Sequence, residues 1–251
     1  MSRADPLLVF DLDGTILEIN SFPRWALSMV ACDVAGLSAL RRVRLSLAAQ
    51  RLLLTRKLGR ADHGALLAGM QTAWRRGCGE EAEEAAKRFS QRLLQRVRPG
   101  LRPVLDRVAR GETDAILATA AAEDYALPLG YALGFRHILA TPGHRDEGEA
   151  CNMGARKRDR VLDYAAARGW AGRRIVFFTD HIDDLPLIQA SGAVCWFGTG
   201  AGLREVRARA AGVPVMPCQS LDTPMMMLAF GSAPSRGARP QPAPARASTE
   251  R

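Results

Sequence analysis

The sequence has few cysteines, few aromatic residues and no long apolar run, and each scarcity excludes a class of protein. No apolar stretch approaches the roughly 20 residues of a membrane-spanning helix. The five cysteines are scattered and never form a Cys-x-x-Cys pair, which argues against a disulfide framework and a zinc site. Reduced thiols in a reducing compartment are the simpler account.

Little chain precedes the first apolar run, at residues 7–10. We therefore expect no secretory signal and a soluble, cytoplasmic protein without stable membrane insertion. With 251 residues and 47% hydrophobic content, the chain can bury a substantial core, in one domain or in a domain with a large insertion.

The net charge of +9 is concentrated in one segment. Residues 22–98 hold 15 basic and 6 acidic side chains, so the remainder is balanced. This surplus is either a solvated helix face or a positive rim that attracts anionic substrates. Aromatic residues are few and widely spaced in the segment, which argues against a base-stacking platform and a nucleic-acid partner.

The most informative segment is Leu-Leu-Val-Phe-Asp-Leu-Asp-Gly-Thr at residues 7–15. Its apolar run predicts a strand covered on both faces, and alternation places Asp11 and Asp13 on one side of the carboxyl end. Gly14 permits a sharp turn. Adjacent carboxylates repel until a cation relieves them, and one could attack a substrate while the other moves a proton. The plain alternative is an acidic turn.

Two further segments carry polar groups at predicted element ends. Residues 113–119 predict a strand ending at Thr119, followed by alanines that lead into a helix. A hydroxyl group with free backbone N–H groups at a helix start can cradle a phosphate, although threonine is also a common helix cap. Lys157 begins another predicted helix and is one of only three lysines. It belongs to a solvated basic face or neutralises carboxylate and phosphate together in a tight site.

Acidic residues follow a third predicted strand, at residues 174–179. Asp180 ends the strand, and Asp183 and Asp184 come close behind. Acidic side chains that gather at strand ends form an oxygen-rich site suited to Mg²⁺.

In their order, these segments resemble the four motifs of the haloacid dehalogenase-like superfamily. The matches are Asp-x-Asp-Gly-Thr at 11–15, Thr119, Lys157 and Asp-x-x-x-Asp at 180–184, and the resemblance covers roughly residues 7–215. Asp-Asp-Leu-Pro-Leu-Ile at 183–188 and Cys-x-x-Gly-x-x-Lys at 151–157 look like the phosphoserine-phosphatase-like branch.

The resemblance implies a Mg²⁺-dependent phosphomonoesterase that acts on a small phosphorylated substrate. Asp11 would attack phosphorus and form an aspartyl-phosphate, while Asp13 would protonate the leaving alcohol and then activate water. Thr119 and the Ala120 N–H would hold the phosphoryl oxygens, and Lys157 would offset negative charge. The implied metal ligands are the Asp11 carboxylate, the Asp13 carbonyl and Asp180, with Asp184 or Asp183 in support.

The sequence departs from the family pattern at three positions. Thr179 stands where a glycine is usual, and His181 stands where serine or glycine is common. Asn20 stands where phosphoserine phosphatases tend to carry a glutamate that reads the substrate amine, which argues against phosphoserine itself. Glu18, Asn20 and Arg24 are our candidates for the substrate-binding pocket.

Two other functions stay open. A carbon–halogen hydrolase of the same superfamily would need neither a proton donor for an alkoxide nor Mg²⁺. A non-catalytic binding protein would use the basic segment, for example on nucleic acid.

The predicted fold is α/β, a Rossmann-like doubly wound parallel sheet with an all-helical cap inserted after the first strand. From residue 99, predicted helices alternate with predicted strands, which is typical of a parallel sheet. We place the core at 1–20 and 99–230, the cap at 21–98 and a disordered tail at 231–251. The predicted helices are 101–110, 122–134, 155–168, 183–190 and 201–210, and the predicted strands are 113–118, 136–140, 174–179 and 193–197.

Within the predicted cap, Leu37, Leu40, Val43 and Leu47 give one apolar helix face. Four glutamates at residues 80–84 open another helix, where the helix dipole favours acidic side chains.

Overall fold

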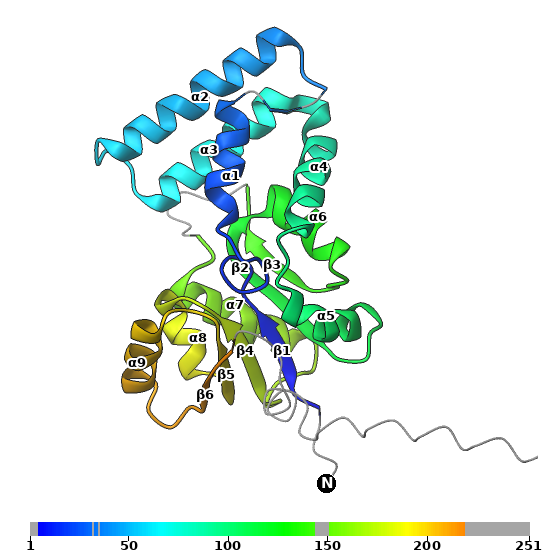
Figure 1. The fold of residues 1–251 in the computed structure, drawn as a ribbon, viewed down its shortest axis with the longest axis vertical. Helices are drawn as coiled ribbons and strands as arrows, with labels where there is room; N and C mark the ends of the chain where they lie inside the picture. The colour runs from blue at the N-terminus through cyan, green and yellow to red at the C-terminus, as the bar shows by residue number, and fades with distance from the viewer. Residues whose placement is uncertain (1–4, 32, 35, 144–150, 219–251) are drawn as a thin grey trace, which may run out of the picture.

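The computed structural model describes residues 5–31, 33–34, 36–143 and 151–218, which are built around one six-stranded parallel sheet (Figure 1). The strand order is β3-β2-β1-β4-β5-β6. The strands are β1 (Leu7–Phe10), β2 (Ala115–Ala122), β3 (Ile138–Thr141), β4 (Ile175–Thr179), β5 (Ala193–Trp196) and β6 (Val215–Pro217). The predicted doubly wound α/β fold is confirmed.

Helices cover both faces of the sheet, because alternate side chains of the buried strands point to opposite sides. Leu8 and Phe10 share a core with α5 (Arg102–Ala109) and α6 (Glu123–Ala132). Leu7 and Val9 belong to a second core, formed with the remaining helices of the sheet. Those helices are α7 (Gly154–Ala167), α8 (Leu185–Gln189) and α9 (Gly200–Arg209).

Strand β1 occupies the point where the strand order reverses, since it pairs with β2 on one side and β4 on the other. In open α/β sheets, this switch point opens a crevice at the carboxyl ends of the strands, where ligands bind. The Asp-x-Asp-Gly-Thr segment follows β1 directly and therefore lies at this crevice.

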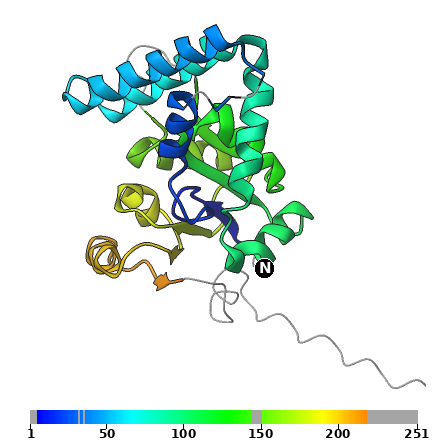
Figure 2. The ribbon, with the colours of Figure 1, turned by 45° about the horizontal axis from the view of Figure 1, so that its top comes forward.

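Four longer helices are inserted between β1 and β2 and lie together at one end of the molecule (Figures 1 and 2). The chain segments that connect them to the sheet run side by side. The Arg98 N–H donates to the Ile16 carbonyl at 2.8 Å, and the Glu18 N–H donates to the Arg96 carbonyl at 3.0 Å. The helices are α1 (Ser21–Val30), α2 (Ala39–Lys57), α3 (His63–Cys78) and α4 (Ala82–Leu94).

Local sequence signals explain where these helices begin. The side chains of Asn20, Ser38 and Asp62 accept backbone N–H groups at the starts of α1, α2 and α3, as helix-capping residues do. The predicted acidic helix start is present at α4, where Glu83 also pairs with Lys87 one turn later, at 2.7 Å. None of the described helices is long and apolar enough to cross a membrane.

Three details differ from the sequence-based expectations. Strand β2 continues to Ala122, because Ala122 pairs with Thr141 across a shift in register, so Thr119 lies inside a strand and not at a helix start. Strand β6 was not predicted. Of the predicted apolar face, Leu37 precedes α2 and is buried, whereas Leu40, Val43 and Leu47 point to solvent, because α2 buries its other side against neighbouring helices. The predicted tail at 231–251 lies outside the described residues.

Candidate active site

The site is built on the turn after β1. The Asp11 N–H donates to the Phe178 carbonyl at 2.8 Å, which continues the pairing with β4 and fixes the first aspartate beside that strand. Gly14 has a φ of +71°, and a side chain there would collide with the carboxylate of Asp180. Glycine therefore allows the turn and the close approach of Asp180 at once.

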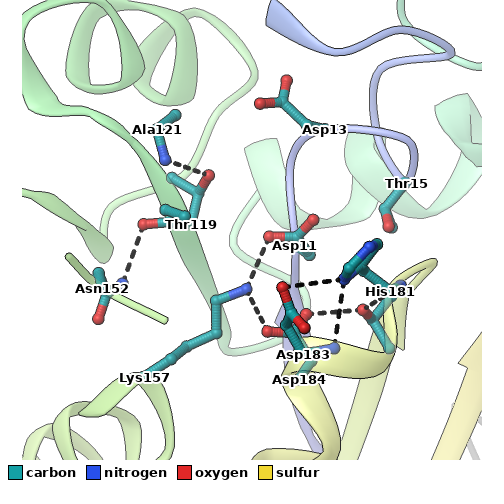
Figure 3. A network of polar contacts seen from close by, with 12 residues as sticks. Asp11, Asp13, Thr15, Thr119, Ala121, Asn152, Lys157, His181, Asp183 and Asp184 are labelled. Atoms are coloured by element: carbon teal, nitrogen blue, oxygen red, sulfur yellow. Dashed lines mark hydrogen bonds and ion pairs between the residues drawn. The ribbon is translucent and has the colours of Figure 1, made fainter. Parts of the chain in front are cut away.

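Lys157, near the start of α7, forms ion pairs with two carboxylates (Figure 3). Its Nζ lies 2.8 Å from Oδ1 of Asp11 and 2.7 Å from Oδ1 of Asp184. The Thr179 hydroxyl donates to the other oxygen of Asp184 at 2.7 Å. Lys157 is only 2% exposed, so water screens these charges weakly.

Burial shapes the protonation of this cluster. Removal from water raises the pKa of Asp11 to about 7, even though the ammonium of Lys157 opposes the rise. Burial alone would lower the pKa of Lys157, but Asp11 and Asp184 outweigh it and raise that pKa above its ordinary value. The lysine therefore stays charged, and Asp11 titrates near neutral pH.

Asp13 is held by a different set of partners. Its Oδ1 accepts the Ser21 N–H at 2.8 Å, and its Oδ2 accepts the Ser21 hydroxyl at 3.0 Å. Since Ser21 donates its only hydroxyl proton to Asp13, the Tyr125 hydroxyl donates to Ser21, at 2.9 Å. Burial raises the pKa of Asp13 to about 6, against the lowering by these hydrogen bonds. A carboxyl group that titrates near neutrality can both give and take a proton.

Thr119 lies at the same edge, within β2. Its hydroxyl accepts the Ala121 N–H at 3.1 Å, and its carbonyl accepts the amide of Asn152 at 3.0 Å. Asn152 also donates to the Leu139 carbonyl on β3 at 2.7 Å. The expectation that Thr119 stands at a helix start is therefore wrong, because Thr119 lies in an irregular stretch of strand that Asn152 holds.

A pocket of about 560 Å³ opens above these groups. Asn20 lines it, although its side chain also accepts the Phe22 N–H at 3.0 Å and caps α1. Arg24 does not line the pocket and is exposed on α1. All the other candidate site residues from the sequence line the pocket, namely Asp11, Asp13, Glu18, Thr119, Ala120, Lys157, Asp180, Asp183 and Asp184.

Another cavity, of about 620 Å³, lies between α3, α4 and α6. None of the motif residues lines it. The candidate site residues that line a cavity therefore lie in the pocket above β1.

Several pocket and support residues escaped the sequence analysis. Ser21, Tyr125 and Asn152 hold the motif residues, but no sequence spacing connects them to their partners. Arg56 and His63 come from α2 and α3 and line the pocket from the helical side. Burial and the nearby Arg56 lower the pKa of His63. For Arg56, the only indication in the sequence that it could lie near an anionic substrate was the basic composition of residues 22–98.

The donor set at this edge suits a hard cation. Among the described residues, no three His, Cys, Asp or Glu side chains are already grouped as a metal cage. Asp180 has one long contact, from the Thr15 hydroxyl at 3.5 Å, and burial raises its pKa. Two carboxylates, a backbone carbonyl and several waters form the oxygen environment that Mg²⁺ favours, so Asp11, Asp13 and Asp180 fit the ion.

Comparisons with known proteins identify the family of the chain. The model of the haloacid dehalogenase-like hydrolase family matches residues 8–189. A probable phosphatase of Mycobacterium tuberculosis is 27% identical over 225 residues, which cover 85% of this chain and 76% of the relative.

Two solved structures share the fold. A protein of unknown function from Bordetella pertussis Tohama I has a TM-score of 0.66 and 19% identity, covering 84% of this chain and 98% of its own. A phosphoserine phosphatase in the form of a phospho-aspartyl intermediate analogue has a TM-score of 0.53 and 10% identity, with 90% and 99% covered. With its family match over most of the length and the four motifs in one pocket, this chain belongs to the haloacid dehalogenase-like hydrolases.

Proposed function

We propose that the protein is a Mg²⁺-dependent phosphomonoesterase that acts through an aspartyl-phosphate on Asp11. One observation carries the proposal: buried Lys157 pairs with Asp11 and Asp184, while Ser21 holds Asp13 separately at the same pocket. A nucleophile and a proton carrier with different partners are what phosphate ester hydrolysis in two steps requires. The relative described as a probable phosphatase supports the same activity.

In the first step, a carboxylate oxygen of Asp11 attacks phosphorus, and the bond from phosphorus to the ester oxygen breaks. Among the described residues, no hydrogen bond engages Oδ2 of Asp11, whereas Oδ1 is paired with Lys157, so Oδ2 is the attacking oxygen. Protonated Asp13 gives its proton to the leaving alkoxide. The phosphoserine phosphatase with the similar fold was solved as an analogue of its phospho-aspartyl intermediate, which is an intermediate of this type.

In the second step, water attacks the phosphorus of the aspartyl-phosphate, and Asp13 accepts a proton from that water. The bond between phosphorus and the Asp11 oxygen breaks, so inorganic phosphate leaves, Asp11 is a carboxylate again and Asp13 is protonated again. Thr119 and the Ala120 N–H hold the phosphoryl oxygens, and Lys157 offsets negative charge on Asp11 and the phosphate.

Asp11, Asp180 and the Asp13 carbonyl would hold the Mg²⁺, with Asp184 in support. When bound, the ion supplies positive charge beside the phosphoryl group. The residues 21–98 act as a cap over the pocket, which contributes Arg56 and His63 to the substrate side. The substrate is a small phosphorylated metabolite, with phosphoserine-like compounds among the candidates, and the enzyme acts in the cytoplasm.

The hydrogen bonds to Asp13 favour a phosphatase over a carbon–halogen hydrolase. A halide leaves without a proton, so a dehalogenase needs no proton donor at this position. Here two hydrogen bonds from Ser21 fix Asp13, and its pKa is about 6. A purely binding protein on this fold would not require this arrangement.

A screen of phosphate esters with Mg²⁺ tests the proposal. It should include phosphoserine, amino-alcohol phosphates, sugar phosphates and lysophosphatidic acid. We expect turnover that EDTA stops and Mg²⁺ restores. Asp11→Asn should abolish turnover, since a neutral amide cannot attack phosphorus, whereas Asp163→Asn on the exposed side of α7 should leave it unchanged. Activity of Asp11→Asn near the wild-type kcat would refute the assignment.

A further inference from the structure

Helix α2 exposes a row of apolar side chains along its outer side. Leu40, Leu47 and Leu54 recur every seven residues. Val43 lies three residues after Leu40, and Leu58, which directly follows the last residue of α2, lies four residues after Leu54. Such spacing places all five on one face of a helix. Their exposed fractions are 60%, 52%, 60%, 56% and 58% for Leu40, Val43, Leu47, Leu54 and Leu58. We call this set the apolar row.

The apolar row is separate from the face that α2 uses for folding. Leu45, Ser46 and Ala49 are the buried residues of α2, and α2 packs against α1 and α3. Figures 1 and 2 show α2 at the outer end of the molecule, away from the sheet. At about 1.5 Å per residue, the row extends for roughly 27 Å, which is a long apolar strip for a water-facing surface.

Basic side chains line the same strip. The helix carries six basic residues and no acidic residue. Arg44 lies four residues after Leu40 and three before Leu47. Arg51 has the same spacing to Leu47 and Leu54, so both arginines lie beside the apolar row on the helix surface. Neither forms an ion pair with any residue that the structure describes.

We propose that this face of α2 is a docking surface for a membrane that contains anionic lipids. An amphipathic helix of this kind lies in the plane of the interface, with its apolar side chains among acyl chains and its basic ones near headgroups. Arginine can bury its stem while the guanidinium reaches a lipid phosphate. This inference does not rest on the proposed catalytic function.

The charges argue against two other occupants. A second copy of the chain would bring two helices without acidic residues face to face, and like charges disfavour that contact. Nucleic acid would satisfy the arginines, but it would place the leucines of the row against phosphates and water. An anionic lipid surface matches the apolar and the basic parts together.

Co-sedimentation of the full chain with vesicles tests the proposal. We expect binding to phosphatidylcholine vesicles in which about a third of the lipid is phosphatidylglycerol, and little binding to phosphatidylcholine alone. High salt should weaken the binding, because screening reduces the attraction to the headgroups.

Paired variants separate the apolar and the basic contributions. Leu47→Gln with Leu54→Gln should lower the partition coefficient at least about tenfold, and so should Arg44→Glu with Arg51→Glu. The matched controls are Leu162→Gln on α7 and Arg102→Glu with Arg204→Glu, all at exposed positions of the sheet domain. These controls should lower binding less than about twofold. Thermal unfolding should show that every variant folds.

Absence of binding to anionic vesicles would overturn the proposal. So would equal binding to neutral vesicles, or equal losses in the control variants. Light scattering without lipid tests whether a second copy of the chain covers the apolar row. If the protein is a dimer and Leu47→Gln with Leu54→Gln converts it to a monomer, the apolar row is a dimer interface and the proposal is wrong.

Discussion

Lys157 is the residue on which the charge balance of the pocket depends. It is buried and contacts Asp11 and Asp184 within 2.8 Å. Replacement by methionine keeps the volume but leaves two buried carboxylates without their cation. Removing one partner of a buried pair costs about 3–5 kcal/mol, so Lys157→Met should lower the free energy of unfolding by about that amount. Urea unfolding in EDTA measures the change without a metal ion in place of the lysine.

The exposed lysine on α4 is a matched control for this prediction. Lys87→Met also removes an ion pair, with Glu83, but in full solvent, and it should leave the urea midpoint unchanged. In the Lys157→Met background, Asp184→Asn should recover part of the lost stability, because one stranded carboxylate disappears. Equal stability of Lys157→Met and the wild type would show that the carboxylates protonate at little cost.

The proton role proposed for Asp13 predicts that the rate loss in its variants depends on the leaving group. Asp13→Asn should slow hydrolysis of alkyl phosphates by about 10²–10⁴ and slow hydrolysis of a nitrophenyl phosphate much less, because nitrophenolate leaves without a proton. Ser21→Ala should show the same pattern at about tenfold, since it removes one hydrogen bond to Asp13. The ratio of kcat for the two esters measures the effect.

Tyr125→Phe is the control for Ser21→Ala. It removes only the hydroxyl that donates to Ser21, and the hydrogen bonds from Ser21 to Asp13 remain. Its kcat ratio should therefore stay near the wild-type value. Equal losses for both esters in Asp13→Asn would contradict the proton role.

At the scale of single residues, the sequence predicts the site residues that stand directly after a recognisable strand. Asp11, Asp13 and Asp180 follow apolar runs, so they had to lie at strand ends. Ser21 and Tyr125 are 104 positions apart and meet only in the folded protein. Serine and tyrosine also occur throughout most sequences, and neither residue stands in a recognisable motif here, which is why no pattern identified them.

At the scale of elements, two ion pairs of one arginine connect the inserted helices to a helix of the sheet. Arg75 on α3 donates to Asp124 at 2.7 Å and to Glu123 at 2.8 Å, both in the first turn of α6. The Asp124 side chain is 6% exposed and also accepts the amide of Gln71 at 3.0 Å. Buried acceptors with two charged or polar donors hold elements together more firmly than surface pairs do.

A double-mutant cycle should measure this connection. We expect Arg75→Met and Asp124→Asn to show a coupling free energy of about 1–2 kcal/mol, discounted because Arg75 is 31% exposed. Arg41 and Glu81 form an equally short pair, at 2.8 Å, with both side chains largely in solvent. Their cycle should give less than about 1 kcal/mol. Similar couplings in the two cycles would mean that burial adds nothing at α6.

The elements differ in how far sequence could predict them. The strands of the sheet centre were readable because they are continuous apolar runs with both faces covered. Strand β6 has three residues and ends in Pro217, so no run or alternation marks it. Helix α2 has apolar residues on two opposite sides, Leu45 with Ala49 and the apolar row. Periodicity predicts such a helix but cannot say which side is buried.

The whole molecule combines a sheet, whose carboxyl edge holds the candidate site, with inserted helices that line the other side of the pocket. The change from apolar runs to Leu, Ala, Arg and Glu after residue 20 predicted this division. It could not predict how the two connecting segments pair, because residues 16–18 and 96–98 are far apart in sequence and short. Their backbone hydrogen bonds at 2.8 and 3.0 Å join the two ends of the insertion.

Arg98 lies at this junction and also supports the turn after β1. Its guanidinium donates to the carbonyls of Gly14 at 2.9 Å and Thr15 at 3.1 Å, and it stacks over the ring of Phe197 at 5.1 Å. The same side chain therefore couples the position of the inserted helices to the loop that carries Asp13. Any closure of those helices over a substrate must move the backbone on which Arg98 is mounted.

Arg98→Met should consequently change kcat and KM together, although Arg98 does not line the pocket. Loss of both donors lets the Gly14–Thr15 turn shift, and a small displacement of a catalytic group costs up to about a hundredfold in rate. Arg96→Met, two residues earlier and exposed, should change neither parameter. Steady-state kinetics at several Mg²⁺ concentrations measures both variants. If saturating Mg²⁺ fully restores the activity of Arg98→Met, Arg98 acts on metal affinity by holding the Gly14–Thr15 turn. The junction of the helices with the sheet would then not explain the defect.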